Sequence, residues 1–229
     1  MPTREGTRRV AALPRGFYDR PTLDVAADLL GKVLLHRTDG ITTSGIIVEV
    51  EAYIGESDPA CHAAPGPTAR NAPLYGPPGY AYVYLNYGIH ALVNVVTEAE
   101  GRPAAVLIRA LAPLEGIDAM RERRARRGKG RRGLAAEAED AALCRGPGNL
   151  TVAMGITVAE NRVDLLGRSL WIEDRGVTLE PPVWTPRIGI RVGTDRLWRA
   201  HVPDHLAVSG PPVKRRGRHS HVVIGSASG

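Results

Sequence analysis

The chain of 229 residues has only two cysteines, Cys61 and Cys144, and no apolar run long enough to span a membrane. Two cysteines at this separation do not make a disulfide framework, so we expect reduced thiols, as is usual in the cytosol. The first residues also lack the apolar stretch of a secretory signal. These absences exclude a disulfide-stapled secreted module and predict a cytoplasmic protein without membrane contact.

Lysine is scarce as well. It occurs only at Lys32, Lys129 and Lys214, so almost all of the 30 basic residues are arginine. Against 24 acidic residues they give a net charge of +6. A basic excess favours a polyanionic partner, but a genome-wide bias towards arginine would give the same excess without any function. Charge alone therefore does not decide what the protein binds.

Aromatic residues make up only 5% of the chain, yet four of the seven tyrosines fall between positions 80 and 87. Tyr80, Tyr82 and Tyr84 alternate, which predicts one face of a strand, and turn-forming residues after them place Tyr87 at the tip of a hairpin. Tyrosine suits strands, but that preference does not explain an aromatic residue on an exposed turn.

Residues 46–53 form the most informative stretch, because apolar and polar positions alternate there with the period of a strand. The pattern predicts one aliphatic face and a second face that carries Glu49, Glu51 and Tyr53 together. Two interpretations are about equally supported by this stretch alone: an edge strand with solvated glutamates, or a reaction site built around a carboxylate and an aromatic ring.

A long loop rich in proline and glycine is expected at residues 55–79, and loops of this length in a compact domain are usually functional or disordered. It contains His62, Thr68, Arg70 and Asn71, which can all donate hydrogen bonds. His62 follows Cys61, but no second pair has ligand spacing, so we expect no metal site.

Arg109 lies in an otherwise apolar strand at residues 104–111 and needs an acidic partner or an anionic ligand if buried; Glu51 or a phosphate would serve. A very basic segment follows at residues 121–132. We favour a mobile loop there over a dedicated DNA contact, which would supply salt-sensitive affinity. Acidic residues soon after weaken the electrostatic case for DNA.

The remaining pattern predicts one main domain. A helix is expected from Thr22 to Leu30, where Gly31 ends it, and further strands at residues 32–36, 169–173 and 187–192. We expect residues 1–16 to be a flexible leader, residues 17–210 to form the functional domain, and residues 211–229 to be a disordered basic tail.

Several stretches taken together resemble the alkyladenine (3-methyladenine) DNA glycosylases of the mammalian type. The similarity runs from about Phe17 to Gly210, and it is most specific at residues 46–62 (IIVEVEAYIGESDPACH), 68–71 (TARN), 78–94 (PGYAYVYLNYGIHALVN), 106–116 (VLIRALAPLEG) and 146–150 (GPGNL). The resemblance implies the fold class α/β (α+β), a single mixed domain around a curved, mostly antiparallel sheet with a protruding β-hairpin. The segment 121–132 is more arginine-rich than this family leads us to expect, and the extreme C-terminus does not match.

The resemblance also assigns roles to individual residues. It implies that Glu51 is the general base and that Arg109 helps to hold the attacking water. The remaining assignments place a flipped base in a slot, with a wedge in the DNA and contacts to its backbone. They are Tyr53 on one face of the base, His62 and Tyr84 on the other, Asn94 against the 2-amino group of guanine, Tyr87 as the intercalating wedge, Thr68 and Arg70 at the DNA backbone, and a main-chain carbonyl near Ile190.

The implied activity is a DNA repair glycosylase that flips alkylated or deaminated purines of the 3-methyladenine or hypoxanthine type out of duplex DNA. It would hydrolyse the N-glycosidic bond with a Glu51-activated water, without a lyase step, because no lysine is placed to form a Schiff base. We expect no cofactor, no metal, a monomer bound to double-stranded DNA, and association with the nucleoid. A non-catalytic nucleic-acid-binding module and a small-molecule hydrolase with an Arg109–Glu51 site remain the alternatives.

Overall fold

The computed structural model describes residues 10–126 and 136–210, and within them eight strands form one sheet in which every pairing is antiparallel. The order is β3-β4-β5-β2-β1-β6, while β8 pairs with β2 and β7 pairs with β8. The strands are β1 (Val33–Thr38), β2 (Ile41–Ile54), β3 (Ala81–Asn86), β4 (His90–Val96), β5 (Ala104–Glu115), β6 (Leu170–Glu173), β7 (Val183–Thr185) and β8 (Arg199–His201).

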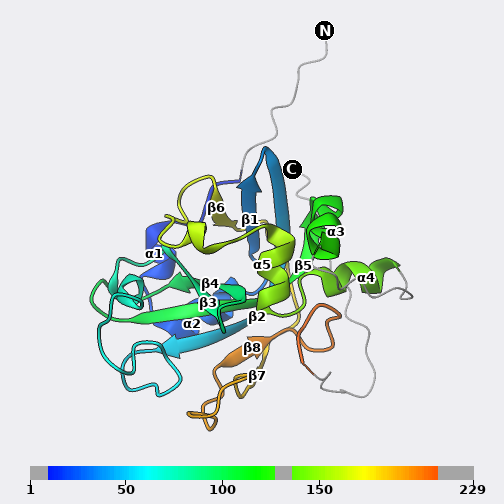
Figure 1. The fold of residues 1–229 in the computed structure, drawn as a ribbon. Helices are drawn as coiled ribbons and strands as arrows, with labels where there is room; N and C mark the ends of the chain where they lie inside the picture. The colour runs from blue at the N-terminus through cyan, green and yellow to red at the C-terminus, as the bar shows by residue number, and fades with distance from the viewer. Residues whose placement is uncertain (1–9, 127–135, 211–229) are drawn as a thin grey trace.

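Short helices surround this sheet, and Figure 1 shows α3, α4 and α5 grouped at one side with β7 and β8 at the lower edge of the view. None of the helices in the described ranges is long and apolar enough to cross a membrane. The helices are α1 (Arg15–Tyr18), α2 (Thr22–Leu29), α3 (Ile117–Arg126), α4 (Ala136–Leu143), α5 (Pro147–Met154) and the 3₁₀ helices η1 (Ala72–Tyr75) and η2 (Val158–Glu160).

The arrangement confirms the predicted mixed α/β domain around a curved, antiparallel sheet. β3 and β4 form the expected hairpin, in which Asn86 pairs with His90 next to the turn. That the hairpin protrudes from the domain stays a prediction.

β2 is the central strand, since it pairs with β5 along one edge and with both β1 and β8 along the other. Its pairing with β5 shifts register at three points, and two of these shifts lie on either side of Glu49. Val48 on β2 and Arg109 on β5 are skipped in the register, each as the extra residue of a bulge. Bulges change the direction of side chains and are common next to active sites, and these two flank Glu49.

The bulges make one sequence prediction wrong, namely the single aliphatic face of residues 46–53. Ile46 and Val48 pack in one hydrophobic cluster, whereas Val50 and Ala52 pack in the main core on the other side of the sheet. An alternation of period 2 reverses its faces wherever one residue is inserted. The main core lies between the sheet and helices α2, α3 and α5.

Residues 187–192, expected to be a strand, form an irregular segment between β7 and β8, so that prediction is also wrong. Of the predicted leader, residues 1–9 lie outside the described residues, whereas Ala12 bridges to Glu173 of β6 and Arg15 begins α1. The predicted tail, residues 211–229, lies outside them as well.

Candidate active site

A cavity of about 390 Å³ opens between the β3–β4 hairpin, the loop after β2 and the segment that follows Arg187. The structure gathers most of the predicted site residues in its wall. They come from the strands β2, β3, β4 and β5 and from the loop and turn between strands: Tyr53, His62, Tyr84, Tyr87, Asn94 and Arg109.

Glu51 lies immediately behind this wall and is fully buried. Its carboxylate accepts hydrogen bonds from the Tyr53 hydroxyl at 2.8 Å and from the Ile188 amide at 2.7 Å, and the Arg109 Nη1 lies 3.1 Å away. All three donors come from residues that line the cavity. Burying a carboxylate costs free energy unless it is paired with a cation and hydrogen-bonded. Arg109 supplies the cation for Glu51, and Tyr53 and Ile188 supply the hydrogen bonds.

Tyr53 is fixed as a hydrogen-bond donor by its surroundings. Burial and the neighbouring Glu51 raise the pKa of its hydroxyl far above the ordinary value, since a phenolate next to a carboxylate in a dry site would be strongly disfavoured. Tyr53 lines the cavity, and its hydroxyl keeps its proton and donates it in the hydrogen bond to Glu51.

Arg109 is buried, as the sequence suggested, and its predicted partner Glu51 is confirmed, but a second glutamate shares it. Its Nε donates to Glu49 at 2.9 Å and its Nη2 donates to the Ser209 hydroxyl at 3.2 Å. Burial alone would lower the pKa of Arg109, but Glu51 and Glu49 outweigh burial and raise it. Arg109 is therefore a permanent cation that joins the two carboxylates.

Glu49 is fully buried and carries a network that the sequence did not reveal. It accepts hydrogen bonds from the Nε atoms of Arg109 at 2.9 Å and Arg199 at 2.6 Å, and from the amide and hydroxyl of Ser209 at 2.7 and 2.9 Å. Burial would raise the pKa of Glu49, but the two arginines and the Ser209 amide lower it below the ordinary value. The only sequence signal was Glu49 itself, because Arg199 and Ser209 arrive from distant segments.

His62 and Tyr84 both line the cavity, with ring centroids 4.4 Å apart. The Nδ1 of His62 is 2.8 Å from the Tyr82 hydroxyl, which fixes the orientation of the imidazole. Burial, helped by the charge of Arg70, lowers the pKa of His62, so the ring is neutral near pH 7. The cavity is therefore lined by several aromatic rings, which can stack on a flat aromatic ligand.

Asn94 of β4 is buried in the cavity wall and donates from its Nδ2 to the Tyr82 carbonyl at 3.0 Å. The sequence left two interpretations open, a residue that lines the pocket and a residue that caps a backbone group. The structure shows that Asn94 does both.

Tyr87 stands at the turn between β3 and β4, where 87% of the residue is exposed and its φ is +50°. Ile89 in the same turn is 62% exposed. A tyrosine in the left-handed region is uncommon and costs free energy. Together with its exposure at the rim of the cavity, this position agrees with a side chain that acts on something outside the protein.

Thr68 and Arg70 do not line the main cavity but line a second hollow of about 290 Å³, and His62 lines both. Thr68 is exposed, and its backbone amide and hydroxyl are both bonded to Asn71. Arg70 is exposed and donates to the Leu85 carbonyl at 3.2 Å, next to the hairpin tip.

The basic segment 121–132 is described only up to Arg126. Arg121 binds Asp118 and Asp140, and Arg126 binds Glu122 at 2.6 Å. In the described part these arginines therefore have acidic neighbours, while residues 127–132 lie outside the described residues.

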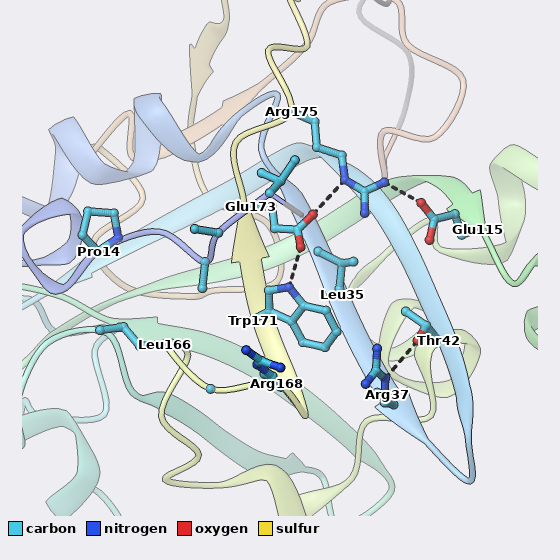
Figure 2. A pocket seen from close by; sticks show the side chains of 14 residues that line it. Pro14, Leu35, Arg37, Thr42, Glu115, Leu166, Arg168, Trp171, Glu173 and Arg175 are labelled. Carbon is cyan, nitrogen blue, oxygen red and sulfur yellow. Dashed lines mark hydrogen bonds and ion pairs between the residues drawn. The ribbon is translucent and has the colours of Figure 1, made fainter. Parts of the chain in front are cut away.

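A larger cavity, about 780 Å³, lies beside β1 and β6 around Trp171 (Figure 2). Its carboxylates are already engaged: Glu173 accepts hydrogen bonds from the Trp171 indole at 2.8 Å and from Arg175 at 2.9 Å, and Arg175 also binds Glu115. The site residues predicted from the sequence are absent from its lining. We therefore place the candidate active site in the cavity of about 390 Å³ that Tyr53 and Arg109 line.

Within residues 10–126 and 136–210, no group of three or more histidine, cysteine or acidic side chains is arranged to hold a metal ion.

The candidate active site is thus a cavity lined by aromatic side chains, with the buried carboxylate of Glu51 directly behind its wall. Residues 16–206 match the family model described as methylpurine-DNA glycosylase. The chain is 48% identical over 210 residues to a protein of Burkholderia lata, covering 90% of this chain and 94% of the relative. It is 45% identical over 206 residues to a protein of Chlorobaculum parvum, with 87% and 93% covered, and 46% identical over 201 residues to one of Methanocella arvoryzae, with 86% and 95% covered. Each relative carries the provisional name 3-methyladenine DNA glycosylase.

The chain belongs to the methylpurine-DNA glycosylase family. It is accordingly a DNA repair enzyme, a hydrolase of the glycosylase class whose partner is DNA. This confirms the class of activity expected from the sequence.

Proposed function

We propose that this chain removes 3-methyladenine and hypoxanthine from duplex DNA by hydrolysis, with Glu51 as the general base. The observation that carries the proposal is the setting of Glu51: it is fully buried, and three groups from the cavity wall, on Tyr53, Ile188 and Arg109, hold its carboxylate. Such a carboxylate is held in one place beside a cavity lined by aromatic rings.

A base inside a duplex must leave the stack before an enzyme can reach it, and this costs a few kcal/mol. In the proposal the flipped base enters the cavity between Tyr53 on one side and His62 with Tyr84 on the other. Stacking on aromatic rings returns about 1–3 kcal/mol per base. The exposed Tyr87 enters the duplex and fills the space that the base leaves.

In the chemical step, water attacks C1′ of the deoxyribose while the C1′–N bond to the purine breaks and its electron pair leaves with the base. Glu51 takes the proton from the water and stabilises positive charge developing on the sugar. Arg109 helps to position the water, with the main-chain carbonyl of Ile190 as a further candidate, since both residues line the cavity. Arg109 stays charged because the carboxylates of Glu51 and Glu49 stabilise its guanidinium and raise its pKa.

The proposal includes no strand cutting. A lyase step needs an amine that forms a Schiff base with C1′, and among residues 10–126 and 136–210 no lysine lines the cavity. The product is therefore an abasic site in intact DNA.

Asn94 supplies selectivity in the proposal. Its side chain lies in the cavity wall and is held by the Tyr82 carbonyl, so a 2-amino group on the base would have to displace it. 3-Methyladenine and hypoxanthine have no such group, whereas guanine does. Discrimination of this kind works by a clash with the wrong substrate.

The DNA backbone passes the outer side of the slot in this proposal. Arg70 and Thr68 are exposed there, close to the hairpin tip, and can contact phosphates. Such contacts position DNA without reading its sequence.

The test uses duplexes that each contain one lesion, incubated with the full chain. We expect release of free 3-methyladenine and hypoxanthine, and strands that remain intact until the abasic site is cleaved by alkali. Binding to the duplexes without release of any base would contradict the proposal and would favour a non-catalytic DNA-binding module. Breakage without alkali would contradict the purely hydrolytic step.

A further inference from the structure

A buried guanidinium covers one side of the Tyr53 ring. The Cζ of Arg187 lies 4.6 Å from the centroid of the Tyr53 ring and 5.2 Å from that of Trp198. The Arg187 side chain is fully buried and does not line the cavity, whereas Tyr53 does. A base stacked on Tyr53 in the cavity would therefore have a positive charge behind the ring on which it rests.

The carboxylate of Asp58 neutralises the positive charge of Arg187. Its two carboxylate oxygens accept hydrogen bonds from Nη1 and Nη2 of Arg187 at 2.6 and 2.8 Å, and the Asp58 side chain is fully buried as well. Burial would raise the pKa of Asp58, but Arg187 and the amides of Ala60 and Ile54 outweigh it and lower that pKa. Both members of the pair are therefore charged, and together they are neutral.

The same pair fixes the segment that holds Glu51. Nη1 of Arg187 also donates to the Ala52 carbonyl at 3.0 Å, and the next residue, Ile188, donates its amide to Glu51. Arg196 lies 3.5 Å from Asp58, but its side chain is partly exposed, so solvent screens its charge. The charge behind Tyr53 therefore depends mainly on Asp58 and Arg187.

We propose that Asp58 and Arg187 are positioning residues that decide whether the slot accepts a positively charged base: Asp58 cancels the charge of Arg187, so a cationic purine can stack on Tyr53. The inference rests on the proposed function and names the class of lesion to which the site is matched. Neither residue touches the base; both act through the Tyr53 ring.

The chemistry of the lesions makes this testable. A purine methylated at a ring nitrogen such as N3 of adenine carries a positive charge while it is joined to deoxyribose, whereas hypoxanthine is neutral. An unbalanced guanidinium behind Tyr53 would repel the first and not the second, through a buried region where charges are poorly screened. A loss of structure alone would affect both lesions alike.

The experiment measures single-turnover release of 3-methyladenine from methylated duplex and of hypoxanthine from a matched duplex. For Asp58→Asn we expect the ratio of the two rates to fall roughly tenfold, because Arg187 loses its counter-charge. For Arg187→Gln we expect the ratio to move the other way, because Asp58 is then the unbalanced charge. The double variant Asp58→Asn/Arg187→Gln restores neutrality, and its ratio should return close to that of the wild type.

Melting temperatures of all four proteins separate folding from selectivity. If Asp58→Asn does not fold, the shift in Arg187→Gln and its return in the double variant carry the test. If the ratio of the two release rates is unchanged in both folded single variants, the inference is wrong and the Asp58–Arg187 pair only stabilises the structure. The proposed function would not be affected by that result. Failure of the wild type to release either base would instead refute the proposed function, and the inference with it.

Discussion

Two glutamates on β2, Glu49 and Glu51, are both fully buried and both contact Arg109, yet their surroundings differ. Glu49 is enclosed by Arg109, Arg199 and two groups of Ser209. Glu51 is held instead by residues that form the wall of the cavity. The same residue type on the same strand is thus enclosed in the framework at one position and bound to the cavity wall at the other, where we propose that it acts as the general base. Burial alone does not tell these roles apart; the location of the donors does.

The largest expected effect on stability comes from Glu49→Gln. The change leaves Arg109 and Arg199 buried with one counter-charge fewer, and breaking a buried ion pair costs about 3–5 kcal/mol. We expect a loss of this size in the free energy of unfolding, measured by urea denaturation. Glu122→Gln is the matched control, since its ion pair with Arg126 is largely exposed and should be worth less than about 1 kcal/mol. Equal losses in both variants would show that Glu49 is not a framework residue.

The stabilisation by Glu49 should also depend on pH. Its folded pKa is lower than the ordinary value of 4.5, so its contribution is fully present above that pH and is lost as the pH falls through the folded pKa. The difference in unfolding free energy between the wild type and Glu49→Gln should therefore be constant near neutral pH and shrink on acidification. Urea midpoints between neutral pH and the lowest pH at which both proteins fold measure this, and a difference that grows in acid would contradict it.

Much of the site could be predicted from the sequence because its parts lie in a few continuous motifs. Residues 46–62 carry Glu51, Tyr53 and His62, and the tyrosine cluster carries the hairpin. Arg109 was recognised as a cation that needs a partner. Local spacing and the chemistry of single side chains mark these residues as candidates, and the resemblance to a known family assigns their roles.

The remainder depends on contacts between distant segments. The two bulges in β2 and β5 leave no local signal, although they reverse the faces of the strand. The Glu49 cluster joins residues up to 160 positions apart. The Arg187–Asp58 pair joins an irregular segment to the loop after β2. No periodicity in the chain predicts such pairs, since they arise only when the sheet is assembled.

Tyr87→Ser should have a moderate effect that concerns only DNA. If Tyr87 fills the space that the flipped base leaves in the duplex, loss of its ring should weaken binding and slow excision roughly tenfold, by the value of one stacking contact. The loss should be much smaller on single-stranded DNA. Ile41→Ser is the control, since Ile41 is also exposed but does not line the cavity. Equal losses on duplex and single strand would show that Tyr87 is not a wedge.

Asn94→Ser should have the smallest effect on the repair reaction and a visible one on selectivity. Removing the side chain leaves room for a 2-amino group, so excision of undamaged guanine should rise several-fold while hypoxanthine release stays nearly intact. The lost hydrogen bond to the Tyr82 carbonyl should cost about 1 kcal/mol of stability. Both excision rates are measured beside the melting temperature. A lower melting temperature without any gain on guanine would contradict the role in selectivity.

The most direct test of the proposed role of Glu51 is the single-turnover rate of hypoxanthine release by Glu51→Gln, with lesion binding measured on the same preparation. Glutamine keeps the shape and one acceptor oxygen, which can serve the Ile188 amide while its amide nitrogen donates to the Tyr53 hydroxyl, but it cannot take a proton from water. General base catalysis contributes about 10²–10⁴-fold, so we predict a loss in that range or greater with binding retained. Release at close to the wild-type rate by a folded Glu51→Gln protein would show that Glu51 is not the general base.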